Sequence, residues 1–319
     1  MFNFLRLFMK PKILIFLNHS YSFWKIKQED FERVQNTFSE FEVIVAFSKE
    51  ETEKHIMDAT IYYGWYFPEN WVDQVKNLKW IHTPAAGKDY IYSKALEESS
   101  IEFTNSYGYH GLFMAQHAIG MILYFARGFQ YCHKEFWPRE DVANKFFDLI
   151  GSKLLIVGCG SIGEKIASLA SHFGIEVYGY RRSLPKNSDS EIKWVSESNL
   201  KDTFAVSDII IDLLPANENT FNYFDQEKFS WMNKNTLFMN LGRGKTVDEE
   251  ALFESLKSNK LLGCGLDVLN DETQKSEHPL YSLPNVLITP HSSAFSQQYL
   301  GKSVDLFIEK LHEKKVAFV

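Results

Sequence analysis

Three polar residues with complementary chemistry stand at separate points in the second half of the chain: Arg243, Glu272 and His291. An arginine can hold a carboxylate, a histidine can shuttle a proton near neutral pH, and a carboxylate can orient that histidine. Taken singly, His291 is also compatible with a structural histidine, and the other two with surface charges. Their joint placement after candidate strands favours a catalytic set.

A glycine-rich turn follows an apolar run directly and opens a helix-like segment: Gly158-Cys159-Gly160-Ser161-Ile162-Gly163. This spacing in a strand-to-helix context is typical of a dinucleotide-binding fold. The first glycine permits the tight turn, the second lets a pyrophosphate approach the backbone, and the third lets the helix pack on the strand. The amides of Ser161 and Ile162 are then expected to face the phosphates. The alternative is a purely structural glycine turn.

The end of the second strand of this fold selects the coenzyme. An NAD-selective site carries an acidic residue there, about 20 residues past the glycines. Arg181, Arg182 and Ser183 stand there instead, and Arg181 comes 18 residues after Gly163. Two guanidiniums and a hydroxyl suit a 2′-phosphate, although a solvated basic turn is the alternative. The sequence predicts NADP(H) as the preferred coenzyme, with NAD(H) also possible.

The elements that must position these residues form an α/β pattern. In an open parallel sheet, loops at the carboxyl ends of the strands converge on the ligand crevice. Arg243, Glu272 and His291 each follow a candidate strand, so we expect them to meet there. The candidate strands are 154–157, 176–180, 209–213, 236–240, 262–266 and 286–288, with a helix from the glycine turn to about Phe173.

A similar pattern precedes it, with candidate strands at 13–17, 42–46, 61–65, 79–83 and 101–104, and helices at 50–57 and 71–77. Residues 111–127 are apolar nearly all round, which favours a helix between two domains that could act as a hinge. Residues 296–314 read as an amphipathic helix that returns to the first domain. We therefore predict two doubly wound parallel-sheet domains. A Rossmann dinucleotide-binding domain, 119–292, is inserted into a flavodoxin-like substrate domain, 1–118 plus 293–319.

Composition bounds the class of protein. The chain has 319 residues, which at about 150 residues per domain indicates two domains. Its formal charge is −7, from 34 basic and 41 acidic residues. Nucleic acid and anionic membranes are held by clustered Lys and Arg, so neither is an expected partner. A hydrophobic content of 45% excludes a disordered chain.

The compartment and metal content follow from the cysteines. Cys132, Cys159 and Cys264 are far apart and odd in number, so we expect no disulfide framework or CxxC metal site, and a cytoplasmic location. The apolar stretch 111–126 is shorter than the roughly 18 residues that span a bilayer, which favours a buried helix. Charged residues and a proline split the apolar run in 1–17, so it reads as an extension before a strand.

Two histidines and two aromatic residues leave alternatives open. His110 and His117 are seven residues apart on one helix face, but no carboxylate or cysteine accompanies them in the sequence. A packing or hinge role is favoured over a metal site. Trp65 and Tyr66 follow the third strand, where they can line a substrate cleft or pack against the core.

In several motifs and their order, the chain resembles the D-isomer-specific 2-hydroxyacid dehydrogenase family. The resemblance covers nearly the whole chain. Beside the glycine turn, it rests on Leu78 to Asp89, Thr104 to Ser106, Leu213 to Thr220 and the segments around Arg243, Glu272 and His291. It implies an oxidoreductase that transfers hydride between NADPH, or NADH, and a small 2-keto acid such as glyoxylate or hydroxypyruvate.

The same resemblance implies roles for individual residues. Arg243, Glu272 and His291 become the catalytic residues, Arg243 and His291 also contacting the substrate. Ala86 and Gly87 lend backbone amides to the substrate carboxylate. The family pattern also adds coenzyme-binding positions, with Asp267 holding the nicotinamide carboxamide: Leu214, Pro215, Thr220, Leu241 and Asp267. An aromatic segment with His133, Trp137 and Pro138 corresponds to one that serves the family's dimer interface, so a homodimer is expected.

Three departures from the family pattern affect the substrate more than the reaction. Thr273 replaces the usual proline after the glutamate, and the residues after it, 274–277, are more polar than expected. The pair Arg181 and Arg182 resembles the NADPH-preferring glyoxylate and hydroxypyruvate reductases of the family. Segment 106–111 carries two tyrosines, so the substrate mouth is expected to differ.

Two other functions occur on related chains. Corepressors that sense the nucleotide keep the fold and the catalytic residues, but this sequence shows no long disordered tail or peptide-docking extension. Formate dehydrogenases place a glutamine where this chain has Glu272. A turnover assay separates the corepressor alternative from the enzyme.

Overall fold

The computed structural model describes residues 10–88, 91–132, 139–184, 191–273 and 278–318. The chain divides into two compact units. Unit 1 comprises residues 1–109 with 295–319, and unit 2 comprises residues 110–294. The division falls at the start of the long apolar helix, whereas the sequence prediction sets the boundary inside that helix, at 118 and 119.

Unit 1 is built on a five-stranded parallel sheet in the order β2-β1-β3-β4-β5, the flavodoxin-like order that the sequence predicts. Its strands are β1 Lys12–Phe16, β2 Glu42–Val45, β3 Ile61–Gly64, β4 Trp80–Thr83 and β5 Glu102–Asn105. The two central strands β1 and β3 pair from Ile13 and Ile61 onward. They are apolar because both faces of the sheet are covered.

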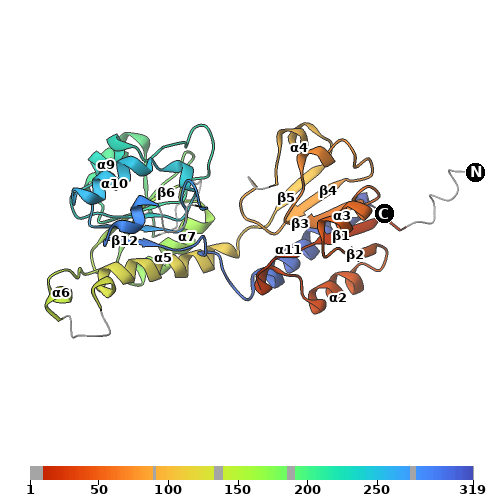
Figure 1. Ribbon diagram of the computed structural model, residues 1–319, viewed down its shortest axis with the longest axis horizontal. Coiled ribbons are helices and arrows are strands. Elements are labelled where there is room, and N and C mark those ends of the chain that lie inside the picture. The colour runs from red at the N-terminus through yellow and green to blue at the C-terminus, as the bar shows by residue number, and fades with distance from the viewer. Residues whose placement is uncertain (1–9, 89–90, 133–138, 185–190, 274–277, 319) are drawn as a thin grey trace, which may run out of the picture. The chain divides into compact units, whose positions relative to one another are not determined.

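Helices cover the two faces of this sheet (Figure 1). They are α2 Gln28–Thr37, α3 Lys49–Ile56, α4 Lys94–Glu98 and α11 Tyr299–Lys314, with 3₁₀ turns at Ser22–Trp24, Glu69–Trp71 and Lys315–Ala317. On one face, Leu14 and Tyr62 pack with Ile56 of α3. On the other, the ring of Phe307 in α11 stacks on Tyr63, with 4.4 Å between centroids. The C-terminal helix therefore returns to unit 1, as predicted.

One predicted element of unit 1 is wrong. Residues 71–77 form successive turns rather than a helix. Trp71 and Val75 are both buried, and a turn bond from the Gln74 amide to the Trp71 carbonyl (2.9 Å) helps bring them to the core. The segment is short because it lies between Pro68 and the start of β4 at Trp80. Single turns are enough to bury its two apolar residues, so no continuous helix forms.

Unit 2 contains a seven-stranded parallel sheet in the order β12-β11-β10-β9-β6-β7-β8. Reading outward from β6, this is the predicted Rossmann arrangement with one further strand. The strands are β6 Lys153–Val157, β7 Glu176–Tyr180, β8 Lys193–Val195, β9 Ile209–Asp212, β10 Leu237–Asn240, β11 Gly263–Leu266 and β12 Val286–Ile288. Strand β8 has only three residues at the sheet edge and carries no sequence signal strong enough to predict it.

The helices of unit 2 are α5 His110–Ala126, α6 Arg139–Ala143, α7 Ser161–Ser171, α8 Leu200–Val206, α9 Gln226–Trp231 and α10 Glu249–Lys257, with 3₁₀ turns at Phe129–Tyr131, Glu197–Asn199, Gly244–Thr246 and Pro279–Ser282. Most of them pack on the two faces of the sheet, whereas α6 contacts the 3₁₀ turn at Phe129–Tyr131. Alternate residues of β6 separate the two cores. Ile156 packs with Ile119 of α5 and Ile166 of α7, and Leu155 packs with Phe204 on the opposite face. Helices α5 and α7 lie alongside each other (Figure 1), which explains why α5 is apolar nearly all round.

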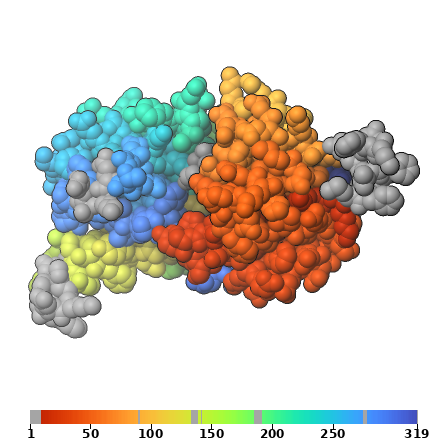
Figure 2. Space-filling model, turned by 45° about the vertical axis from the view of Figure 1, so that its right-hand side comes forward, coloured from red at the N-terminus to blue at the C-terminus, as the bar shows by residue number. Residues whose placement is uncertain are grey.

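The space-filling view shows the red and orange segments of unit 1 at the surface of the face in view (Figure 2). Within the described ranges, no helix combines the length and apolar character needed to cross a bilayer. The cysteines are all free thiols, with Cys159 and Cys264 buried.

Candidate active site

The glycine turn has the geometry that dinucleotide binding requires. Gly158 adopts φ +84°, a conformation that side-chain-bearing residues rarely adopt, and a Cβ there meets the Leu213 carbonyl carbon at 2.9 Å. A Cβ on Gly163 meets the Cys159 Sγ at 2.9 Å, because helix α7 lies tightly on the turn. Gly160 has no atom within 4 Å of such a Cβ. The second glycine is therefore the one that leaves open space where a pyrophosphate can approach.

Loops from three neighbouring strands converge beside this turn. The backbone of Leu214, after β9, lies close to Gly158 after β6 and to Gly242 after β10. A Cβ on Gly242 meets the Leu214 carbonyl oxygen at 2.7 Å. Glycines at both contacts let the three loops pack backbone against backbone. Together with the open position at Gly160, this surface fits a dinucleotide.

A buried carboxyl that the sequence analysis missed holds two of these loops together. Asp212, the last residue of β9, accepts hydrogen bonds from the Leu214 amide (2.8 Å) and the Thr246 hydroxyl. Burial raises the pKa of Asp212 to about 7, and the two hydrogen bonds oppose the rise. A polar residue at the end of an otherwise apolar strand is the signal that could have identified it.

Arg181 follows the last residue of β7, where the sequence predicts the coenzyme-selecting site. Its guanidinium lies 5.9 Å from the ring centroid of Trp194 on β8 and 4.0 Å from the carboxylate of Glu164 on α7. Arg182 and Ser183 are exposed. The site therefore holds two guanidiniums and a hydroxyl, together with one nearby carboxylate that the sequence analysis did not include.

Glu272 and His291, which lie 19 residues apart in the sequence, are in contact. The loops after β11 and β12 bring the Glu272 carboxylate oxygens to 3.0 and 3.1 Å from the His291 Nδ1. Both side chains are partly exposed, at 48% and 37%. A carboxylate on Nδ1 orients the imidazole and leaves Nε2 as the nitrogen for proton transfer.

Arg243 belongs to the loop after β10, the strand next to β11. The buried side chain of Asn240 holds this loop, accepting from the Gly242 amide (2.9 Å) and donating to the Arg243 carbonyl (3.0 Å). The arginine's own guanidinium donates to the Gly242 carbonyl at 2.8 Å. The three predicted catalytic residues therefore lie on loops that follow three adjacent strands at one edge of the sheet.

Asp267 organises the loop that carries His291. Its fully buried carboxylate accepts from the Thr289 hydroxyl (2.6 Å) and from the amides of Ser292 (2.8 Å) and Ser293 (2.9 Å). The His291 amide donates to the Asp267 carbonyl at 2.9 Å. His291 itself has φ +51°, a left-handed conformation rare outside glycine. These bonds are what hold the histidine in that conformation.

The remaining predicted coenzyme positions differ in exposure. Leu214 is partly buried, Pro215 is exposed, and the Thr220 hydroxyl closes their loop by donating to the Pro215 carbonyl at 2.5 Å. Leu241 is 2% exposed and its side chain packs in the core of unit 2. Only its backbone can face a ligand.

In unit 1, the predicted substrate loop lies at the carboxyl end of β4. The side chain of Asn105, at the end of β5, donates to the Ala86 carbonyl at 2.6 Å and so fixes the backbone that leads to Gly87. The hydroxyls of Tyr109 and Tyr299 both donate to the Pro84 carbonyl, at 2.9 and 3.1 Å. Tyr109, one of the two tyrosines in segment 106–111, thus supports this loop.

Aromatic side chains gather beside the same loop. Six rings come from the loops after β1 and β3, the segment before α11 and the start of that helix, and each lies within 6 Å of at least one other, centroid to centroid: Tyr21, Phe23, Trp24, Trp65, Phe295 and Tyr299. We call these six residues the aromatic cluster. Tyr21 is 48% exposed. Trp65 therefore packs in a cluster that also presents apolar surface.

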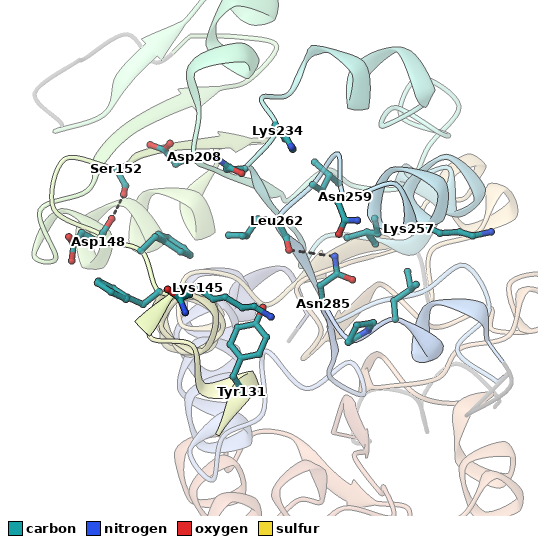
Figure 3. A pocket seen from close by; sticks show the side chains of 18 of the residues that line it. Tyr131, Lys145, Asp148, Ser152, Asp208, Lys234, Lys257, Asn259, Leu262 and Asn285 are labelled. Atoms are coloured by element: carbon teal, nitrogen blue, oxygen red, sulfur yellow. Dashed lines mark hydrogen bonds between the residues drawn. The ribbon is translucent and has the colours of Figure 1, made fainter. Parts of the chain in front are cut away.

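A hollow of about 1000 Å³ lies in unit 2, at the opposite edge of the sheet from the candidate catalytic residues. Figure 3 shows residues that immediately precede strands, among them Ser152, Asp208 and Asn285, around this hollow. Ligands of open α/β sheets bind at the carboxyl ends of strands. The hollow lies at the amino ends, so it is not the candidate active site.

Some predicted features lie outside the described residues: the aromatic segment His133, Trp137 and Pro138, and the polar loop 274–277. Thr273, which replaces the family's proline, donates through its amide (2.9 Å) and hydroxyl (2.5 Å) to the Asp271 carboxylate. Within the part of the chain that the structure describes, no group of three His, Cys, Asp or Glu could hold a metal ion.

Comparison with known proteins agrees with this fold and identifies the family. Residues 119–293 match the family model for the D-isomer specific 2-hydroxyacid dehydrogenase, NAD binding domain. The chain is 31% identical to the hydroxypyruvate reductase of Thermotoga maritima over 72% of this chain and 76% of that protein. It is 28% identical to the D-3-phosphoglycerate dehydrogenase of Methanocaldococcus jannaschii over 85% of this chain, but only 52% of that protein.

A solved structure agrees in fold. The NAD-complexed D-isomer specific 2-hydroxyacid dehydrogenase from Lactobacillus delbrueckii ssp. bulgaricus has a TM-score of 0.78 at 19% identity, covering 95% of this chain and 97% of that one.

The fold, the glycine turn and the family match define a nicotinamide-dependent oxidoreductase. The chain belongs to the D-isomer-specific 2-hydroxyacid dehydrogenase family, as the sequence motifs predict. Within that family it is an NAD(P)-dependent enzyme of the 2-hydroxyacid dehydrogenase type.

Proposed function

We propose that this enzyme reduces 2-keto acids to D-2-hydroxy acids, with NADPH preferred and NADH possible, and that Arg243, Glu272 and His291 carry the reaction. The observation that carries the proposal is the 3.0 Å contact between Glu272 and His291. The strands that precede these two residues, β11 and β12, lie on one side of β10, in the order β12-β11-β10, and β10 precedes Arg243. The same unit contains the glycine turn, so coenzyme and catalytic groups share one sheet edge. Glyoxylate and hydroxypyruvate are the proposed substrates, by analogy with relatives that carry those names.

Bound coenzyme supplies the hydride that reduces the carbonyl carbon of the acid. The planar guanidinium of Arg243 suits the substrate carboxylate, which it can hold through two parallel hydrogen bonds. His291 gives its Nε2 proton to the oxygen that becomes the hydroxyl. Glu272, at the Nδ1 of that histidine, stabilises the protonated ring before transfer. Proton flow reverses when a hydroxy acid is oxidised.

A loop of unit 1 carries further residues to which the family pattern assigns a role in substrate binding. The backbone amides of Ala86 and Gly87 are proposed to bind the substrate carboxylate, and Asn105 holds their loop in place through its 2.6 Å bond. Asp267 is proposed to bind the nicotinamide carboxamide. Three hydrogen bonds from its own loop hold the Asp267 carboxylate in place.

Arg181 and Arg182 support the preference for NADPH. A 2′-phosphate near Arg181 gains charge-assisted hydrogen bonds, and the ring of Trp194 supports the guanidinium from one side. Glu164, 4.0 Å from Arg181, opposes the preference because it repels the phosphate. A Glu164→Gln variant is therefore expected to favour NADPH further, while NADH use stays close to that of the parent.

The aromatic cluster favours 2-keto acids with a bulky aryl side chain as a second group of substrates. It adjoins the Pro84 to Gly87 loop through Tyr299, whose hydroxyl donates to the Pro84 carbonyl at 3.1 Å. An acid with a bulky aryl side chain can cover part of the exposed Tyr21 ring, which glyoxylate cannot do because it has no side chain.

Parallel rates with NADPH and NADH test the proposal. Oxidation of each coenzyme is measured against glyoxylate, hydroxypyruvate, pyruvate and phenylpyruvate. The proposal expects turnover with at least one of these acids and a higher kcat/KM with NADPH. If the protein binds coenzyme but turns over none of the acids, at acid concentrations that saturate related reductases, the result would instead favour a nucleotide-sensing corepressor.

We also propose a homodimer in the cytoplasm. Phe129, Phe146 and Ile150 are 55%, 46% and 84% exposed and flank the aromatic segment that serves the family's dimer interface. Burying such side chains against a second copy is favourable. Light scattering on the purified chain should give twice the monomer mass, and Ile150→Glu should shift it toward the monomer.

A further inference from the structure

His117 is a buried polar side chain that the proposed mechanism does not use. It lies on α5, and only 20% of its side chain is exposed. Its Nε2 is 3.1 Å from the Thr289 hydroxyl oxygen and 3.7 Å from the nearer carboxylate oxygen of Asp267. Burial lowers the pKa of His117, against the opposing charge of Asp267, which favours the neutral ring.

The direction of these hydrogen bonds follows from proton counting. A threonine hydroxyl has one proton and two acceptor positions. The 2.6 Å contact between Thr289 and Asp267 has the length of a charge-assisted bond, so the hydroxyl proton goes to the carboxylate. The Thr289 oxygen must then accept from His117, which places the ring proton on Nε2. The resulting chain of donors runs from His117 through Thr289 to Asp267.

This chain ends on the loop that carries His291. Thr289 is two residues before His291, and its carbonyl accepts from the His291 amide at 2.9 Å. Asp267 holds the next two residues through the amides of Ser292 and Ser293. The loop keeps His291 at φ +51°. A residue with a side chain rarely adopts this left-handed conformation, which persists only where the surrounding structure holds it.

We propose that His117 is a positioning residue, whose Nε2–H donates to the Thr289 hydroxyl, fixes that hydroxyl toward Asp267 and thereby sets the orientation of the His291 loop. This inference rests on the proposed role of His291 in proton transfer. His117 touches no reacting atom in this account. Its loss should therefore reduce turnover while the phosphate-binding turn of Gly158 to Gly163 keeps its affinity for coenzyme.

Variants at His117 separate a donor role from mere packing. His117→Phe keeps a ring of similar size without a donor, and His117→Gln restores an amide donor near the position of Nε2. We expect kcat to fall about tenfold in the phenylalanine variant, since small misplacements of catalytic groups are costly, and to recover most of that loss with glutamine. The Kd for NADPH should stay within about twofold of the parent. His172→Phe is the control, because His172 follows α7 directly and its ring bonds to the Ser168 carbonyl of that helix.

Thr289→Val removes the hydroxyl that links His117 to Asp267, so this variant tests the same series of hydrogen bonds. If His117 acts through Thr289, the double variant His117→Phe with Thr289→Val should have the kcat of the worse single variant. Multiplicative losses would overturn the inference, and so would equal losses in the phenylalanine and glutamine variants. A phenylalanine variant with parental kcat would overturn it as well.

A readout without turnover keeps this test separate from the proposed function. Nitrogen-15 NMR of the imidazole in the free protein should show a neutral His117 with its proton on Nε2 at pH 7, and Thr289→Val should change that signal. A proton on Nδ1, or a charged ring, would overturn the inference even in an active enzyme. If no 2-keto acid is reduced but the Nε2 proton is observed, the proposed function fails and the bond chain stands.

Discussion

The two first glycines of the turn should respond to alanine in opposite ways. Gly160 has φ −100° and open space around a Cβ, so Gly160→Ala should fold normally. It should even gain about 0.5 kcal/mol in free energy of unfolding, because alanine restricts the unfolded chain. The methyl group nevertheless occupies the space where the pyrophosphate is expected. We predict that the Kd for NADPH rises at least tenfold, about 1.4 kcal/mol.

Gly158→Ala should instead damage the fold. The left-handed φ of +84° costs a non-glycine residue about 1–2 kcal/mol, and the new Cβ meets backbone atoms of Leu213 and Leu214 at 2.9–3.0 Å. We expect the free energy of unfolding to fall by about 2 kcal/mol or more.

Urea denaturation followed by fluorescence gives the stability of each variant, and quenching of its tryptophan fluorescence by NADPH gives the affinity. A Gly160→Ala protein that is as stable as the parent and binds coenzyme equally well would refute the assignment of this turn to the pyrophosphate.

Four further outcomes follow. His291→Ala should lower kcat by about 10²–10⁴-fold with coenzyme affinity nearly unchanged, and retention of most turnover would remove the histidine from the mechanism. Glu272→Gln should lower kcat for keto-acid reduction by about tenfold or more, because the His291 ring loses the carboxylate that orients it; an unchanged kcat would contradict their contact in solution. Changing both Arg181 and Arg182 to Ala should reduce the kcat/KM ratio of NADPH over NADH about tenfold, more clearly at low salt, and an unaltered ratio would assign selectivity elsewhere. Burial lowers the pKa of His82 to about 3, so the free energy of unfolding should fall by about 1.4 kcal/mol per pH unit as the pH drops from 6.5 toward 3; an NMR titration of His82 near 6.5 would contradict this.

Hydrophobic pattern was sufficient for the sheets. All five strands of unit 1 and six of the seven strands of unit 2 coincide with segments predicted from the sequence, most of which are apolar runs of three to five residues. Strand β8 was missed because its three residues pair only at the sheet edge. Helix α2, Gln28–Thr37, was missed because few of its residues are apolar.

Site residues that are close in sequence are also predictable from the sequence, whereas those that meet only in the tertiary fold are not. The glycine turn is local in sequence, so its spacing identified it. Asp212 and Thr246 are 34 residues apart, and His117 and Thr289 are 172 apart, and each pair meets only through the tertiary fold. No local pattern distinguishes such residues from ordinary polar ones. His117 was therefore assigned to packing or a hinge, although its ring contacts the loop of a candidate catalytic residue.

Hydride transfer itself can be followed directly. NADPH carrying deuterium at the transferred position of C4 is incubated with the enzyme and hydroxypyruvate or phenylpyruvate, and the hydroxy acid is analysed by chiral chromatography with mass spectrometry. The proposed function predicts one deuterium at C2 of the D-hydroxy acid, formed in step with NADPH oxidation and nearly abolished by His291→Ala. A hydroxy acid without deuterium, or coenzyme oxidation without any hydroxy acid, would contradict it.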